Sequence, residues 1–175
     1  MKLFSILAFI FLTASFYSNI VLADETQSYI IVSDKLPLFS TEYDPQRDPF
    51  ADGKTAIELA IKTQRRILIE VGGDWCKWCH ILDKFIKSDP QLEQVLHNTF
   101  VVLKVNVSDE NSNKKFLSAF PKTLGYPHMY VTESDGHVVH SQDTGKFLVN
   151  LKYSKNKFLE FLKKWQLKPI RKVEM

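Results

Sequence analysis

The sequence predicts an α/β domain in which a central mixed β-sheet is flanked by helices on both faces. Two short, continuous apolar runs, residues 67–71 and 100–107, are typical of strands that are covered on both sides, as in a parallel sheet. A third run at 128–132 is followed by turn residues and a returning strand, which indicates an antiparallel hairpin. Amphipathic helical patterns lie between these strands. This alternation of strands and helices is typical of the α/β class.

The first residues are expected to direct export rather than to fold. Lys2 precedes an apolar stretch at residues 3–12, and Ala23 ends a small-residue pattern typical of signal-peptide cleavage sites. An uncleaved membrane anchor is the alternative, because the apolar stretch is nearly long enough to span a bilayer. Ser15, Ser18 and Asn19 interrupt the apolar residues that such an anchor would need, which favours cleavage. We therefore expect residues 1–23 to be a signal peptide, cleaved after Ala23, that directs the protein to the periplasm or out of the cell.

The remaining chain has the size of one domain, and we expect it to be a monomer. The chain's formal net charge of +3 is weak, and acidic residues are mixed evenly among the basic ones, so nucleic acid is not an expected partner. A disulfide between its two cysteines, Cys76 and Cys79, would close a loop too short to stabilise the fold much. Exported proteins that use disulfides for stability have several, so this pair is expected to serve reactivity.

Residues 24–51 are expected to form an extended N-terminal arm. Residues 29–32 could be a short strand, but prolines interrupt the residues after it. From residue 36 to residue 50 the arm is expected to pack aromatic side chains against the domain. These side chains are Phe39, Tyr43 and Phe50.

The domain itself is expected to cover residues 52–167. Asp52 is the predicted N-cap of a first helix, whose apolar stripe ends before the strand at 67–71. Two glycines permit a turn out of that strand, and residues 74–88 have the apolar spacing of a second helix. Pro90 is at the favoured first position of a third helix. The later elements are expected to be a strand at 100–107, a short helix at 111–120, strands at 128–132 and 137–141, a helix at 155–167, and a tail at 168–175.

Cys76 and Cys79 are predicted to lie one turn apart at the start of the second helix. This spacing places both side chains on one helix face, at a distance that suits a disulfide. The free N–H groups and the dipole at a helix N-terminus stabilise an anion, and Lys77 adds a positive charge nearby. Because such surroundings lower the pKa of a thiol, Cys76 is the expected nucleophile. Cys79, one turn deeper, is expected to be shielded and to resolve the mixed disulfide.

Glu70 is the only charged residue in the apolar run at 67–71, six positions before Cys76. A carboxyl group buried there would have a raised pKa, which suits it to accept or donate the proton of Cys79. If the strand instead lay near an edge of the sheet, Glu70 would point to solvent. Apolar neighbours on both sides favour the buried, proton-transferring role.

The strand, the Trp-Cys-x-x-Cys motif at 75–79, the helix after it and Tyr126-Pro127 before a hairpin together resemble the thioredoxin superfamily. The resemblance covers about residues 52–165 and implies a thioredoxin fold. It also implies a cis Pro127 beside the disulfide, with Tyr126 offering backbone hydrogen bonds to an extended substrate. Only about 5–6% of X-Pro bonds are cis, so this isomer is implied by the resemblance alone. In this family an acidic residue lies six positions before the first cysteine, as Glu70 does here.

The closest similarity is to exported single-domain members and to the C-terminal domain of periplasmic disulfide reductases. It implies a thiol–disulfide oxidoreductase that exchanges the Cys76–Cys79 disulfide with protein thiols and disulfides. It further implies a membrane or soluble redox partner, and no cofactor beyond that disulfide. Lys77-Trp78 replaces the Gly-Pro of thioredoxin, and His80 replaces the usual lysine. These departures leave the direction of electron flow open.

Residues around the disulfide are expected to bind substrate. The resemblance implies that the Trp75 ring shields the site while partly exposed, and Trp78 could narrow access to Cys76. His128, directly after Pro127, could adjust Cys76 or touch substrate, with packing as an equal alternative. The expected substrate-binding residues are Trp75, Lys77, Trp78, Tyr126, Pro127 and His128.

Other functions fit parts of the same motif. Cys76 to His80 also spells C-x-x-C-H, the attachment signature of c-type haem, and Met129 or Met175 could be the second axial ligand. Small cytochromes of this type are largely helical, whereas this motif follows a buried strand. A non-catalytic peptide-binding or chaperone module is a further alternative, but such a module needs neither Cys76 nor Cys79.

A zinc site is not expected. The two cysteines could be joined by His137 and His140, but the gap between the pairs far exceeds the roughly 12–20 residues of common zinc fingers. The two histidines are also three residues apart on a predicted strand, so their side chains point to opposite faces.

Overall fold

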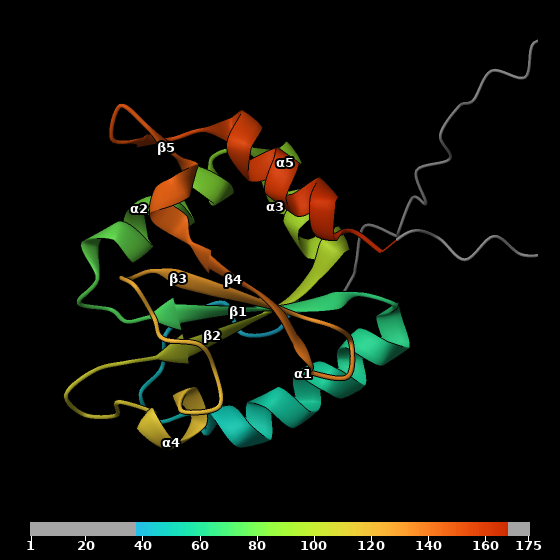
Figure 1. The fold of residues 1–175 in the computed structure, drawn as a ribbon, viewed down its shortest axis with the longest axis vertical. Helices are drawn as coiled ribbons and strands as arrows, with labels where there is room; N and C mark the ends of the chain where they lie inside the picture. Colours follow the sequence, from blue (N-terminus) through green and yellow to red (C-terminus); the bar gives the residue numbers. More distant parts are fainter. Residues whose placement is uncertain (1–37, 168–175) are drawn as a thin grey trace, which may run out of the picture.

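A four-stranded mixed β-sheet forms the centre of the fold in the computed structural model, which describes residues 38–167 (Figure 1). Its strands lie in the order β2-β1-β3-β4. β1 (Arg66–Gly72) pairs in parallel with β2 (Phe100–Asn106) and antiparallel with β3 (His128–Thr132), which pairs antiparallel with β4 (Val138–Asp143). The predicted mixed sheet with a central first strand is therefore confirmed. The predicted signal peptide, the first half of the arm (residues 24–37) and the tail lie outside the described residues.

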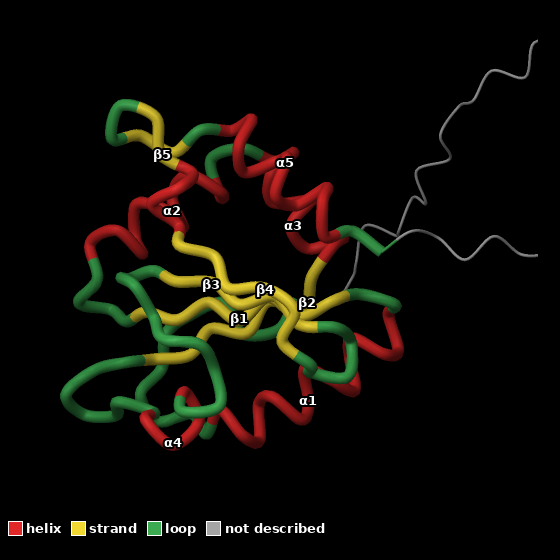
Figure 2. Tube along the Cα trace, in the orientation of Figure 1, coloured by secondary structure: helices red, strands yellow, loops and turns green. Residues whose placement is uncertain are grey.

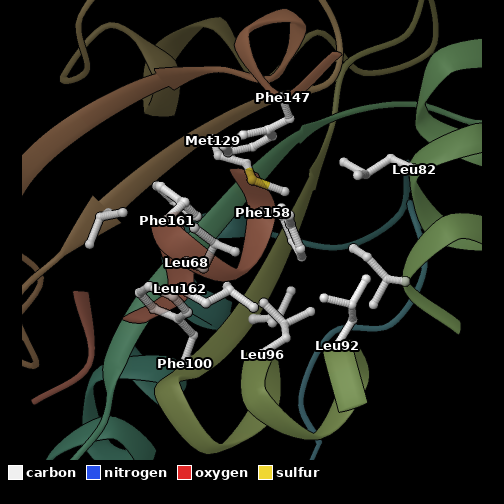
Figure 3. Packing of buried hydrophobic residues seen from close by; sticks show 13 residues of the cluster. Leu68, Leu82, Leu92, Leu96, Phe100, Met129, Phe147, Phe158, Phe161 and Leu162 are labelled. Carbon is white, nitrogen blue, oxygen red and sulfur yellow. The ribbon is translucent and has the colours of Figure 1, made fainter. Parts of the chain in front are cut away.

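Helices cover both faces of this sheet, as Figures 1 and 2 show. α1 (Pro49–Thr63) and α4 (Lys114–Leu117) lie on one face. α2 (Lys77–Lys87), α3 (Pro90–Thr99) and α5 (Lys155–Trp165) lie on the other. The layers are held by two separate apolar clusters, one on each side of the sheet, and Figure 3 shows the cluster under α2, α3 and α5. The labelled residues of that cluster are Leu68, Leu82, Leu92, Leu96, Phe100, Met129, Phe147, Phe158, Phe161 and Leu162.

The two faces of β1 and β2 carry different residues because side chains alternate along a strand. Ile69 and Val71 point into the cluster beneath α1, whereas Leu68 points toward α2, α3 and α5. By this alternation Glu70 and its parallel partner Lys104 point to the α2 side. These two charged residues are therefore buried beneath the helix that carries the cysteines.

The start of α1 differs from the expectation. Asp48, not Asp52, is the N-cap, and its carboxylate accepts a hydrogen bond from the Phe50 N–H at 2.9 Å. Pro49 is the first helical residue, where the N–H that proline lacks would have had no helical partner. Asp52 instead forms an ion pair with Arg47, which precedes the helix. The first helix thus begins before residue 52, and the last residues of the expected arm are helical.

Other helix boundaries differ from the predicted ones, and a 3-10 turn and a short hairpin were not predicted. The helix expected at 74–88 begins at Lys77, and the helix expected at 111–120 is limited to Lys114–Leu117. Thr144–Phe147 forms a 3-10 turn, followed by a two-stranded hairpin of β5 (Leu148–Val149) and β6 (Lys152–Tyr153). The strand at 128–132 and the helix that begins at Pro90 are confirmed.

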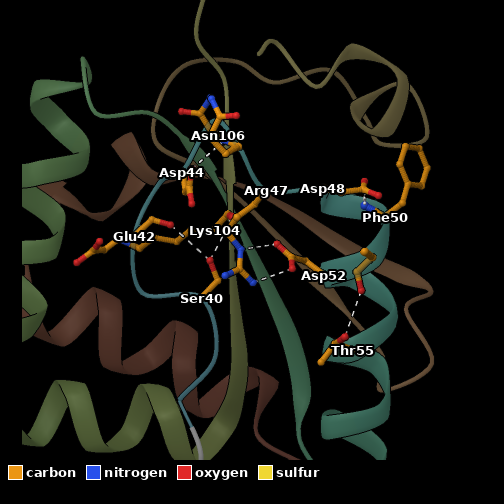
Figure 4. A network of polar contacts seen from close by, with 12 residues as sticks. Ser40, Glu42, Asp44, Arg47, Asp48, Phe50, Asp52, Thr55, Lys104 and Asn106 are labelled. Atoms are coloured by element: carbon orange, nitrogen blue, oxygen red, sulfur yellow. Dashed lines mark hydrogen bonds and ion pairs between the residues drawn. The ribbon is translucent and has the colours of Figure 1, made fainter. Parts of the chain in front are cut away.

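The described part of the N-terminal arm crosses the outer edge of β2 (Figure 4). The Ser40 N–H donates to the Val102 carbonyl at 3.2 Å, and the Ser40 hydroxyl donates to the Lys104 carbonyl at 3.4 Å. Phe39 packs with the cluster beneath α1. The arm thereby satisfies backbone groups at the sheet edge, which would otherwise be open to pairing with another chain.

Within residues 38–167, no helix combines the length and apolar character needed to cross a membrane.

Replacing Asp48 by Ala is expected to lower the free energy of unfolding by about 1 kcal/mol, because the first turn of α1 loses its side-chain cap. Asp52→Ala is the comparison, since it removes the partly exposed ion pair with Arg47 but leaves the cap of the first turn in place, and it should cost less than Asp48→Ala. Urea denaturation of both variants measures the difference. A larger loss for Asp52→Ala would contradict a helix that begins at Pro49.

Candidate redox-active site

A disulfide joins Cys76 and Cys79 where the chain leaves β1 and enters α2, with their Cα atoms 5.2 Å apart. Cys76 is the N-cap of α2, and its Sγ atom accepts a hydrogen bond from the Cys79 N–H at 3.1 Å. The sulfur therefore lies at the positive end of the helix, where a thiolate is stabilised. Cys76 retains 3% exposure and Cys79 none, so a partner can reach only Cys76. The two cysteines thus lie as predicted, at the start of the helix with Cys79 the more deeply buried.

Gly72 allows α2 to approach the end of β1 closely. A Cβ atom at this position would come within 2.6 Å of Cys79 Sγ and 2.7 Å of Tyr43 Oη. Both contacts are too short for any side chain, so only glycine fits here. Cys79 is consequently packed directly against the strand.

Trp75 lies beside the disulfide and is 59% exposed. Its indole N–H donates to the Val107 carbonyl at 2.5 Å, and its ring meets the Tyr126 ring edge-on at a centroid distance of 5.5 Å. The indole is therefore held in place while much of its surface remains open to a partner. Trp75 and Tyr126, two of the predicted substrate-binding residues, are brought together.

Trp78 lies on the first turn of α2 and is 37% exposed. Its ring meets Tyr153 of β6 edge-on at 6.1 Å, so the unpredicted hairpin supports it. Lys77 is exposed at the start of the same helix. His80 Nε2 lies 2.6 Å from the Asp74 carbonyl oxygen, which places its ring over the turn that leads into α2.

Pro127 lies next to the end of β1, because Val71 pairs with His128 in the antiparallel register. The Tyr126–Pro127 peptide bond is cis. The hydroxyl of Thr144 donates to the Pro127 carbonyl at 2.6 Å and fixes this turn from the 3-10 segment.

His128 is placed differently from the other predicted substrate-binding residues. Its side chain points to the face of α1, where the ring packs against Tyr130, and it is only 1% exposed. Nε2 lies 2.8 Å from the Ser141 hydroxyl, and burial lowers the imidazole pKa. His128 therefore has almost no surface for a substrate to touch, and its contacts fit the packing alternative.

Glu70 is buried on the α2 side of β1, with 2% exposure. Burial raises the pKa of its carboxyl group, attraction to Lys104 opposes the rise, and repulsion by Asp83 adds to it. The Tyr43 hydroxyl donates to Glu70 Oε1 at 2.5 Å. A carboxyl group with these surroundings retains its proton to a higher pH than an exposed glutamate does.

Lys104 and Asp83 form an ion pair beside Glu70, with Nζ 2.6 Å from Asp83 Oδ1. Neither residue was predicted from the sequence. Lys104 could have been found by the same signal as Glu70, because it is the single charged residue of β2 and pairs with Glu70 in register. Asp83 and Tyr43 have no comparable signal, since tertiary packing alone brings them to the site.

The other residues considered as metal or haem ligands have surface or packing positions. His137 is exposed in the β3–β4 turn, and His140 packs against Trp165 of α5. Met129 is fully buried in the apolar cluster, and Met175 lies outside the described residues. Within the described residues, no three His, Cys, Asp or Glu side chains gather into a group that could hold a metal ion.

Comparison with known proteins identifies the family of the chain. It matches the family model Thioredox_DsbH, described as "Protein of unknown function, DUF255", over residues 38–166. The "Thiol:disulfide interchange protein DsbD" of Citrobacter koseri is 33% identical over 79 residues, which are 45% of this chain but only 14% of that protein. The DsbD of Salmonella typhi is 31% identical over 78 residues, again 14% of its length. The chain thus spans a small part of these relatives.

Two solved structures share the fold. A disulphide isomerase from Xylella fastidiosa Temecula1 has 27% sequence identity and a TM-score of 0.60, over 74% of this chain and 98% of that one. The oxidised C-terminal domain of Neisseria meningitidis DsbD has 20% identity and a TM-score of 0.51, over 74% and 100%. With the family match, these similarities confirm the predicted thioredoxin fold.

Replacing Glu70 by Gln is expected to change how stability depends on pH. Because the pKa of Glu70 is raised in the folded state, the native protein binds this proton more tightly than the unfolded chain, and Glu70 lowers stability as pH rises above the unfolded pKa. The free energy of unfolding of Glu70→Gln relative to wild type should therefore increase as the pH rises above about 4.3, the usual pKa of a glutamate in an unfolded chain.

Denaturant unfolding of the oxidised proteins across this pH range measures the effect. Glu160→Gln, at an exposed position on α5, is the matched control and should show no such trend. An identical pH dependence in both variants would contradict a perturbed carboxyl group at Glu70.

Proposed function

Because the chain belongs to the Thioredox_DsbH family, we propose that it is a thiol–disulfide oxidoreductase that exchanges its Cys76–Cys79 disulfide with protein thiols and disulfides. The observation that carries this proposal is the position of the disulfide: it lies at the N-terminus of α2, and only Cys76 is reachable. The disulfide closes a loop of very few residues, so it would stabilise the fold only a little. Its position is therefore better explained by reactivity than by stability.

In the reducing direction, the Cys76 thiolate attacks one sulfur of a client disulfide. A bond forms between Cys76 Sγ and that sulfur, and the other client sulfur leaves as a thiolate that takes a proton from solvent. Cys79, as a thiolate, then attacks Cys76 Sγ, so that the Cys76–Cys79 bond forms and the bond to the client breaks. Two electrons pass from the protein to the client, and in the oxidising direction every step is reversed.

Glu70 is proposed to accept the proton of Cys79 in the second step and to return it in the reverse reaction. Its burial and raised pKa support this role, since a base that works near neutral pH needs a pKa closer to 7 than that of an exposed carboxyl group. The Lys104–Asp83 ion pair lies beside it, where Lys104 lowers and Asp83 raises the pKa of the Glu70 carboxyl group.

The exposed aromatic surface beside Cys76 supports a protein as substrate. Trp75, just before α2, and Trp78, on its first turn, are both partly exposed. Tyr126 and Pro127 are proposed to present backbone groups to an extended client segment, and Lys77 to contribute charge. Indole rings that are held in place offer contact area at a small entropic cost, and they are enriched at protein interfaces.

We also propose that residues 1–23 direct export to the periplasm or to the outside of the cell and are removed by cleavage after Ala23. The exported protein is proposed to be a monomer. There a membrane or soluble redox partner would exchange electrons with Cys76–Cys79, and no other cofactor would be needed. Mass spectrometry of the secreted or periplasmic protein tests the processing: a mature chain that begins at Asp24 is expected. Retention of the full mass in a membrane fraction would show that residues 1–23 are an anchor.

The roles of the two cysteines predict which variant traps clients. Cys79→Ser should accumulate mixed disulfides with client proteins, because Cys76 can attack but nothing resolves the product. Cys76→Ser should accumulate none, since Cys79 is buried. Non-reducing gels after rapid acid quenching, followed by mass spectrometry, detect these adducts. Trapping by Cys76→Ser alone would reverse the assigned roles.

Reduction of insulin disulfides tests turnover. The wild-type protein with dithiothreitol should accelerate insulin precipitation over the reductant alone, and Cys76→Ser should abolish this acceleration. Peptide binding that survives Cys76→Ser, combined with no turnover by the wild type, would instead indicate a non-catalytic binding module.

A further inference from the structure

Tyr43, which the sequence pattern indicated only as a packing residue, is hydrogen-bonded to Glu70, and its hydroxyl faces Gly72, which the Cys79 sulfur also faces. We propose that the Tyr43 hydroxyl carries the proton between the Cys79 thiol and the Glu70 carboxylate during the resolving step. This inference rests on the proposed oxidoreductase function and adds a residue from the N-terminal arm to its machinery.

The hydroxyl group of Tyr43 is hydrogen-bonded to Glu70 and borders the same space at Gly72 as the Cys79 sulfur. It donates to Glu70 Oε1 at 2.5 Å, and its oxygen lies close to Gly72. A Cβ atom at Gly72 would meet the sulfur at 2.6 Å and the phenol oxygen at 2.7 Å, so both atoms occupy the space that a side chain there would fill. A hydroxyl group has one donor hydrogen and two acceptor lone pairs. It can therefore donate to Glu70 while it accepts the hydrogen of the Cys79 thiol.

The arm holds Tyr43 in this place from both sides. Ser40 is hydrogen-bonded to β2 through the Val102 and Lys104 carbonyls. Two residues after Tyr43, the Pro45 carbonyl accepts a hydrogen bond from Asn111 Nδ2 at 2.9 Å. The Lys104 ammonium lies 4.8 Å from the centroid of the Tyr43 ring, a cation–π contact that fixes the ring over the charged group. The position of the hydroxyl thus results from contacts on both sides of Tyr43.

Burial and the charged groups around Tyr43 keep its phenol protonated and neutral, as a group that only passes a proton on must be. Lys104 on β2, Asp83 and Lys87 on α2, and Tyr153 on β6 face the Tyr43–Glu70 pair. Burial and the negative charge of Glu70 raise the Tyr43 pKa well above its usual value, so the phenol keeps its proton. Tyr43 consequently acts by passing a proton on, and Glu70 remains the group that stores it.

Protons and electrons balance in this step. In the mixed disulfide, the Cys79 thiol gives its proton to Tyr43 Oη as Tyr43 gives its own to Glu70. The Cys79 thiolate attacks Cys76 Sγ, the Cys76–Cys79 bond forms, and the client sulfur leaves with the electron pair of the broken bond. Glu70 then holds one proton, which returns along the same path in the reverse reaction.

The test is stopped-flow oxidation of the reduced full-length protein by Ellman's reagent, an aromatic disulfide. Its first phase, attack by Cys76, depends on reagent concentration, whereas the second, resolution by Cys79, does not. Tyr43→Phe, which removes only the hydroxyl, should slow the second phase by roughly tenfold to a hundredfold at pH 7 and leave the first within about twofold. The midpoint of the second-phase pH profile should move upward, because the lost hydrogen bond had lowered the pKa of Glu70.

Two further variants make the test specific. Tyr43→Phe combined with Glu70→Gln should be no slower in the second phase than Glu70→Gln alone, because the two groups act in one path. Tyr130→Phe also deletes a buried phenol hydrogen bond, to the Pro121 carbonyl on the other face of the sheet, and should leave both phases unchanged. Equal slowing of both phases by Tyr43→Phe, or independent effects of Tyr43→Phe and Glu70→Gln, would overturn the relay.

The wild type separates this inference from the function on which it rests. A wild-type protein that lacks the concentration-independent phase would overturn the proposed function together with the relay. A normal second phase in both the wild type and Tyr43→Phe would overturn the relay alone.

Discussion

The close contact between the end of β1 and the first turn of α2 determines the geometry of the whole site. Only glycine fits at position 72, so the Cys79 sulfur lies directly on the strand, and Cys76 is left as the reachable sulfur at the helix N-terminus. The same contact encloses Glu70, two residues earlier on the same face of β1. A larger residue at position 72 would lift the helix, let water reach the carboxyl group and misplace Cys79.

The buried charges beneath α2 show how function shapes this part of the fold. Burying a carboxyl group is unfavourable unless it is hydrogen-bonded or paired, and Glu70 has the phenol of Tyr43 and the nearby ammonium of Lys104. Lys104 in turn is held by Asp83. An apolar residue at position 70 would be simpler to pack. The protein instead keeps an ionisable group beneath the helix that carries Cys79, from which the proposed reaction removes a proton. The arm that covers this group also closes the edge of β2.

Most of the fold could be predicted from regular sequence patterns, whereas the helix caps and the tertiary contacts could not. Apolar runs and helical stripes indicated the sheet and the helices, and the Cys76–Cys79 spacing with Glu70 indicated the centre of the site. The start of α2 was missed because its N-cap is Cys76, which is not a usual capping residue. The β5–β6 hairpin turns at Asn150 and Leu151, both with positive φ, without the glycine that normally signals such a turn. Residues far apart in sequence, such as those on the arm, are joined to the site only by packing.

The reduction potential of the Cys76–Cys79 pair distinguishes a disulfide that exchanges electrons from one that only stabilises the fold. The oxidised and reduced protein can be equilibrated with glutathione buffers of known potential and the two forms counted after alkylation. A pair that exchanges electrons with proteins is expected to titrate as a single two-electron couple between about −270 and −120 mV. A value below about −300 mV, where the glutathione pool cannot reduce it, would mark a structural disulfide and contradict the redox role of Cys76 and Cys79.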